Sequence, residues 1–180
     1  MRSFPVNSPV FTYLAEKLRF YSPKLLTLFI LLFSLAPTYL PGYSAVRPNF
    51  MLIPVFYWAV YKPENFSVIA AFTFGLMQDL LEETPLGVNT LVFTVFYILA
   101  ESQRRFLSNK PFSSVWVGFA VLSLIILFLN WLIIAINYGR FSPFGTAFIG
   151  YLILLAAYPV VVWPCARLYL YLLDKNDGDV

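Results

Sequence analysis

Histidine is absent from this sequence, and Cys165 is its single cysteine. Without histidine the chain lacks the commonest general base and the commonest metal ligand, which excludes zinc sites, Ser-His-Asp triads and Cys-His pairs. One cysteine cannot form an internal disulfide, and a cysteine within an apolar segment is typically a small buried side chain. A glycine-rich phosphate loop is also missing. The sequence therefore predicts no catalytic residue, no metal site and no cofactor.

Charge is also scarce. Asp, Glu, Lys and Arg make up 12% of the 180 residues and hydrophobic residues 60%, whereas an ordinary globular domain is about a quarter charged. Such a chain cannot present most of its surface to water, and its long uncharged runs indicate that the surface faces lipid. We therefore predict an all-α integral membrane protein with one membrane domain and no large soluble domain.

Six apolar runs follow one another, and we interpret each as a transmembrane helix. They cover residues 25–40, 49–61, 66–81, 86–100, 115–138 and 144–173. The predicted plan is a cytoplasmic or interfacial segment at 1–22, a six-helix transmembrane domain at 23–173 and a cytoplasmic tail at 174–180. Within the first segment, Ser8 followed by Pro9 is typical of a helix N-terminus, and the pattern beyond it fits a short helix at the membrane surface.

The second run has only 13 residues, about 20 Å as a helix against a hydrocarbon core of about 30 Å. A re-entrant segment is the alternative, and the basic residues decide, because Lys and Arg collect in cytoplasmic loops. If all six runs span and the N-terminus is inside, ten basic residues are cytoplasmic: Arg2, Lys17, Arg19, Lys24, Lys62, Arg104, Arg105, Lys110, Arg167 and Lys175. Arg47 and Arg140 are then the two outside. If the second run does not span, five lie inside and seven outside, so six spans with cytoplasmic N- and C-termini are favoured.

This topology places Arg47 and Asp79 near the outer ends of neighbouring helices. Pairing would relieve the desolvation of both charges. Gly75, one turn before Asp79, removes side-chain bulk and lets another helix approach, and Asn89 at similar depth could complete the network. Two interpretations stay open: the pair holds two helices in register, or it binds a partner directly.

Other polar residues receive simpler interpretations. We expect Asn130 and Asn137 to form hydrogen bonds between helices. Glu101 and Arg105 are spaced to support a helix end. The cytoplasmic basic cluster of Arg104, Arg105 and Lys110 sets the topology first, and could also meet anionic lipid or an acidic partner.

Three short motifs resemble the family of rod shape-determining proteins called MreD. These are Arg47-Pro48-Asn49 at the start of a short apolar helix, Gly75-x-x-x-Asp79-Leu80, and Leu86-Gly87 at the start of the next helix. The resemblance covers about residues 25–173. It implies a structural and partner-binding network made of these residues: Arg47, Pro48, Asn49, Gly75, Asp79, Leu86, Gly87 and Asn89.

The resemblance also implies a function and partners. It implies a non-enzymatic, multi-pass subunit of the bacterial inner membrane that takes part in cell elongation, cell-shape maintenance and lateral peptidoglycan synthesis. The direct partner would be MreC, with RodA, a class B penicillin-binding protein and MreB in the same complex; the other contacts would be with membrane lipid, not with nucleic acid. The implied fold is similar to the six-helix substrate-binding subunits of energy-coupling-factor transporters, an analogy that says little about function.

Two rival functions follow from the residues. A substrate-binding subunit of a vitamin-type importer would need small residues on its first helix for docking, whereas the run at 25–36 is bulky. A membrane enzyme could use Asp79 with Glu82 and Glu83, but no second base or metal ligand accompanies these acids.

Overall fold

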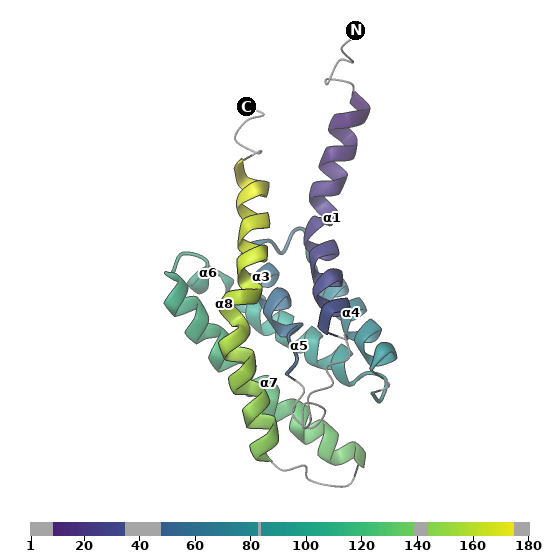
Figure 1. The fold of residues 1–180 in the computed structure, drawn as a ribbon, viewed down its shortest axis with the longest axis vertical. Helices are drawn as coiled ribbons and strands as arrows, with labels where there is room; N and C mark the ends of the chain where they lie inside the picture. Colours follow the sequence, from purple (N-terminus) through teal and green to yellow (C-terminus); the bar gives the residue numbers. More distant parts are fainter. Residues whose placement is uncertain (1–8, 35–47, 83, 139–143, 175–180) are drawn as a thin grey trace.

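The computed structural model describes residues 9–34, 48–82, 84–138 and 144–174. Every regular element in this part of the chain is helical, as the sequence predicts. The helices are α1 (Pro9–Ser34), α3 (Leu52–Tyr61), α4 (Val68–Leu81), α5 (Val88–Ser102), α6 (Arg104–Leu107), α7 (Phe112–Tyr138) and α8 (Phe144–Asp174). The described part is therefore an all-helical bundle (Figure 1).

Helix α1 begins at Pro9, which fits the first helical position because that residue needs no N–H donor there. The helix then continues through Pro23 without a break for 26 residues. The predicted boundary between residues 22 and 23 falls within this helix and stays a prediction. Buried Thr27, one turn after Pro23, donates a hydrogen bond from Oγ1 to the Pro23 carbonyl oxygen at 2.7 Å. This local bond provides an acceptor for the hydroxyl proton of a side chain that lies among apolar neighbours.

Helix α3 is the buried centre of the bundle. It has 10 residues, about 15 Å of helix, and residues 52–60 are all buried. A helix that is apolar all round is one enclosed by other helices, and α3 contacts α1, α5, α6 and α8. Trp58 donates from Nε1 to Thr27 Oγ1 at 3.2 Å and so ties α3 to α1. The second apolar run can be short because other helices enclose it. Helix α3 fills the core, and its neighbours form the outer surface of the bundle.

Helices α7 and α8 are long and apolar enough to cross a membrane. The candidate spans are Phe112–Ile133 and Gly145–Leu172, and 28% of an 18-residue apolar stretch within each is buried. Helix α8 includes both Pro159 and Pro164 and continues through them to Asp174. Large apolar side chains such as Ile136 and Val160 are exposed on these two helices. A low buried share combined with high hydropathy is the pattern expected of helices that face lipid.

The chain folds so that chemically different groups lie at two ends of the bundle. At one end, which we call the α6 end, Arg104 forms an ion pair with Glu64 at 3.2 Å. At the other, the hairpin end, α4 turns into α5 and Asn49 Nδ2 donates to Asn89 Oδ1 at 3.3 Å. The start of α1 and the end of α8 both lie toward the α6 end, at the top of Figure 1.

Candidate functional site: a carboxylate that caps a neighbouring helix

Asp79 lies near the end of α4 and is almost fully buried, with 1% of its surface exposed. Its Oδ1 accepts hydrogen bonds from the Asn89 backbone N–H at 2.9 Å and from Thr84 Oγ1 at 3.0 Å. Its Oδ2 accepts from the Gly87 backbone N–H at 3.0 Å, and from the backbone N–H and Oγ1 of Thr90 at 3.2 and 2.8 Å. Each carboxylate oxygen therefore has several donors, all from the turn after α4 and the start of α5.

These donors explain why a buried charge is tolerated there. The first N–H groups of a helix have no partner within the helix, and the helix dipole makes that end favourable for a negative charge. The N-cap of α5 is Gly87, which has no side chain to accept those bonds. Asp79 supplies the missing acceptor from another helix. The result is a capping interaction that locks the start of α5 to the end of α4.

Two glycines allow the hairpin to close on Asp79. Gly87 has φ of +100°, a left-handed conformation that glycine adopts without a steric penalty. Gly75 faces the backbone of α5, and a Cβ added there would lie 2.5 Å from Thr90 Cα and 2.8 Å from the Asn89 carbonyl oxygen. The two helices therefore touch backbone to backbone at this point, which brings Thr90 within reach of Asp79.

Asn49 and Asn89 extend the network to the start of α3. Asn89 accepts from Asn49 Nδ2 and donates from its own Nδ2 to Thr84 Oγ1, each at 3.3 Å. The carbonyl oxygen of the Asn49 side chain is buried and has no hydrogen-bond partner among the described residues. Pro48, immediately before it, is buried. Three separate segments of the chain thus meet at the hairpin end.

The structure brings together five of the residues singled out from the sequence: Asn49, Gly75, Asp79, Gly87 and Asn89. Leu86 lies on the same turn, but 69% of its surface is exposed. Arg47 lies outside the described residues, so its pairing with Asp79 stays a prediction. We name the set of Asn49, Asp79, Thr84, Gly87, Asn89 and Thr90 the Asp79 cap.

Sequence reasoning missed Thr84 and Thr90, which supply two side-chain donors to Asp79. A signal for Thr90 was present, since it occupies the third position after the glycine that precedes α5, where helix N–H groups need acceptors. Gln78, the residue before Asp79, is also buried. Its Nε2 donates to Glu82 Oε1 at 3.0 Å, while its Oε1 is buried without a partner among the described residues.

The acidic side chains of the hairpin between α4 and α5 are better placed to stabilise the fold than to transfer a proton. Asp79 is buried and saturated with donors, and Glu82 accepts a bond from Gln78. A general base must reach the proton that it removes, with a free lone pair. Glu83, the third acid of the enzyme hypothesis, lies outside the described residues. The geometry of Asp79 therefore favours a helix-capping role.

The basic cluster lies at the α6 end, away from the Asp79 cap. Helix α5 ends at Ser102. Glu101 and Arg105 therefore lie on different helices, and the expected support between residues four apart on one helix is interrupted. The ion pair that forms instead joins Arg104 to Glu64 across two segments of the chain. In α7, the Asn130 side-chain carbonyl oxygen is buried without a partner in the described structure, so this oxygen does not form the expected hydrogen bond between helices. The Asn137 side chain lies outside the described part.

Comparison with known proteins adds independent information. The family model for rod shape-determining protein MreD matches residues 15–172. The rod shape-determining protein MreD of Haemophilus influenzae is 27% identical over 143 residues, covering 78% of this chain and 83% of that protein. No solved structure gives a significant match. The family match includes all of the Asp79 cap and the basic cluster.

Proposed function

This chain belongs to the MreD family of rod shape-determining proteins, and we propose that it is a non-enzymatic subunit of the complex that elongates rod-shaped bacteria. In this role it spans the inner membrane six times and holds the single-span protein MreC. Through that contact it supports lateral peptidoglycan synthesis and cell shape. MreB, RodA and a class B penicillin-binding protein belong to the same complex and reach this subunit directly or through MreC.

Several features support six spans. Helices α7 and α8 have the length and hydropathy of membrane spans, and four shorter apolar helices accompany them. The start of α1 and the end of α8 lie toward the same end of the bundle (Figure 1), as an even number of crossings requires. The short helices can be accommodated by local thinning of the bilayer. The similarity to energy-coupling-factor subunits is part of this proposal.

The observation that carries the proposal is the Asp79 cap. Its carboxylate holds α4, the following turn and the start of α5 together. The surface around this carboxylate therefore keeps one conformation. That surface includes Leu80 and Leu86, with 63% and 69% of their side chains exposed at the hairpin end. We assign this leucine surface and the neighbouring part of α4 to the contact with MreC. A rigid apolar surface lowers the ordering cost of binding a helix or an extended segment.

Co-purification with MreC tests the proposal. Tagged MreC is captured from solubilised membranes, and the recovery of this protein is measured with Leu80→Ser and Leu86→Ser singly and together. We expect both changes to lower recovery because they remove apolar contact area from exposed positions that folding does not need. Val160→Ser on α8, where 72% of the side chain is exposed, is the matched control and should leave recovery unchanged.

Two results would count against the proposal. One is a folded, monodisperse protein that never co-purifies with MreC. The other is an equal effect of Leu80→Ser, Leu86→Ser and Val160→Ser, which would mean that the hairpin end has no special part in binding. Mass spectrometry of the purified protein checks the importer alternative, since a bound vitamin-like compound would favour that function.

A further inference from the structure

Helix α6 forms a fixed corner at the edge of the bundle. Its last residue, Leu107, is 3% exposed, and its side chain packs where Gly118 of α7 has no Cβ, which would otherwise lie 2.8 Å from Leu107 Cδ2. Gln103 breaks the helix before it, donating its backbone N–H to the Ala100 carbonyl oxygen at 3.2 Å. Helix α6, at the edge of the bundle in Figure 1, is therefore held in place although Arg105 and Phe106 are exposed.

Of the positive side chains around α6, one forms an ion pair and two form none among the described residues. Arg104 is paired with Glu64. Arg105 and Lys110 are exposed, and in the described part of the chain neither forms an ion pair. Lys110 Nζ lies 5.2 Å from the centre of the Phe106 ring. Glu101, the other acid nearby in the sequence, is exposed at the end of α5 and also forms no ion pair among described residues. Two cations are thus available for an anion from outside the protein.

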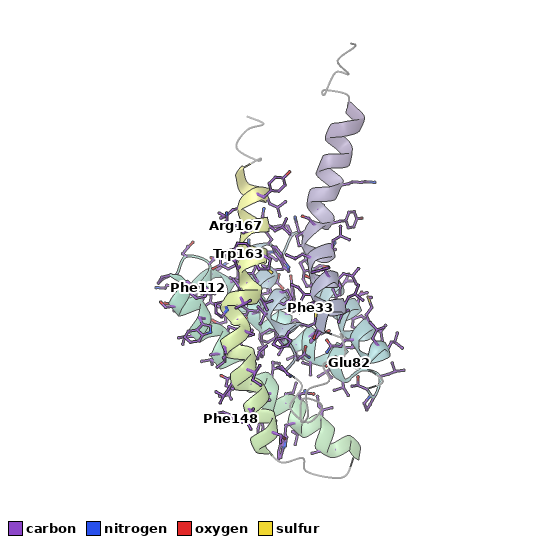
Figure 2. All side chains as sticks on the ribbon, viewed as in Figure 1. Phe33, Glu82, Phe112, Phe148, Trp163 and Arg167 are labelled. Carbon is purple, nitrogen blue, oxygen red and sulfur yellow. The ribbon has the colours of Figure 1, made fainter. Side chains whose placement is uncertain are left out.

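Exposed aromatic rings accompany these cations. Phe106 and Phe112 are 62% and 55% exposed, and Figure 2 shows Phe112 at the outer edge of the molecule. Trp116, one turn later, is 40% exposed and donates from Nε1 to the Leu155 carbonyl oxygen at 3.3 Å. Aromatic rings with one polar edge are typical of the membrane–water boundary.

The depth of the corner follows from α7. Its apolar window begins at Phe112 and has 22 residues, about 33 Å of helix, close to the hydrocarbon thickness of about 30 Å. Phe112 therefore lies where hydrocarbon ends, and Arg105 and Lys110 lie at the level of lipid phosphates. Cations just outside a span are attracted to anionic lipid by about 1 kcal/mol each.

We propose that Arg105, Phe106, Lys110 and Phe112 form a binding site for the phosphate headgroup of an anionic phospholipid. The guanidinium and ammonium groups hold the phosphate, and the two phenylalanines pack against the upper acyl chains. The two phenylalanine rings favour a lipid ligand over an acidic protein. A water-soluble protein would gain no binding free energy from side chains that lie at the hydrocarbon boundary. The site adds to the proposed role of the protein and lies at the end opposite to the leucine surface.

Trp116 provides a local reporter. The protein is placed in phosphatidylcholine bilayers with Trp131→Phe and Trp163→Phe, and its fluorescence is quenched with brominated phosphatidylglycerol or brominated phosphatidylcholine at equal mole fractions. Trp58 is fully buried and contributes a constant background. We expect stronger quenching by phosphatidylglycerol, and a preference that falls about fivefold with Arg105→Gln or Lys110→Gln and about 25-fold with both.

Arg167→Gln is the matched control because it removes one positive charge at the same end of the bundle (Figure 2). Arg167 lies twelve residues beyond Leu155 on α8, about 18 Å along the helix from the Trp116 contact. The preference should persist in this variant and should weaken with salt. Equal quenching by the two lipids would overturn the proposal. So would a preference that Arg167→Gln lowers as much as Arg105→Gln does, because the effect would then reflect net charge alone.

Discussion

At the scale of single residues, two carboxylates show how burial changes the importance of a charge. Asp79 is buried and accepts five hydrogen bonds, three of them from backbone N–H groups. Glu64 is exposed and pairs with Arg104 at 3.2 Å. Bonds to a buried charge are among the stronger ones in proteins, whereas exposed ion pairs contribute little.

We predict that Asp79→Asn lowers the free energy of unfolding by about 3 kcal/mol, because the amide has one acceptor oxygen and turns an NH₂ group toward donors. Glu64→Gln makes the same chemical change on a side chain that is 64% exposed and should cost less than about 1 kcal/mol. The measurement is a titration from mild detergent into sodium dodecyl sulfate, followed by circular dichroism. Similar losses for the two variants would show that the Asp79 cap does not stabilise the fold.

The sequence identified Asp79 as unusual but not its partners. An acidic residue stands out within an apolar run of the sequence, because a buried charge needs partners that compensate its desolvation. Charge alone points to Arg47, which lies outside the described residues, and the described donors around Asp79 are backbone N–H groups and hydroxyls. Backbone groups look alike in a sequence, and only the folded hairpin shows which of them lack partners.

At the scale of elements, the contact between α4 and α5 depends on the absence of one side chain. Gly75 Cα faces the α5 backbone so closely that no larger residue fits. The sequence predicts a close approach at Gly75 from its place in an apolar helix, but does not say which helix approaches. In the structure it is α5, at Thr90, and this contact also brings the capped helix start to Asp79.

We predict that Gly75→Ala destabilises the protein by about 2–3 kcal/mol, because the new methyl group would push two backbones apart. Gly145→Ala is the matched control, since a Cβ at Gly145 meets no atom within 4 Å. That change should be neutral or raise stability by less than about 1 kcal/mol through helix propensity. The detergent titration described for Asp79→Asn measures both, and a Gly75→Ala protein as stable as Gly145→Ala would contradict the backbone contact.

At the scale of the whole molecule, the two ends of the bundle should face opposite sides of the membrane. The ion pair of Arg104 with Glu64 marks the α6 end and the Asp79 cap marks the hairpin end. Helix α5 connects the two ends. Because basic residues collect on the cytoplasmic side, we predict that the α6 end faces the cytoplasm.

Single cysteines test this assignment after Cys165→Ala removes the native thiol. Leu86→Cys at the hairpin end should react with a membrane-impermeant maleimide in intact spheroplasts. Asn109→Cys, between α6 and α7, should react only after the membrane is opened. The reverse pattern would mean that α3 enters and leaves on one side, which is the re-entrant alternative. Cys165→Ala without a new cysteine is the labelling control.

The sequence by itself determined that this protein is all-helical and where its apolar helices lie along the chain. It also determined near which helix ends the charged residues collect. These properties depend on local composition and on hydropathy over a few turns, which each segment carries without reference to the others. Only the tertiary structure decided that α3 is enclosed and that α5 is the helix capped by Asp79. Both depend on which segments meet, and an apolar face or an unpaired N–H group is compatible with many neighbours until the chain has folded.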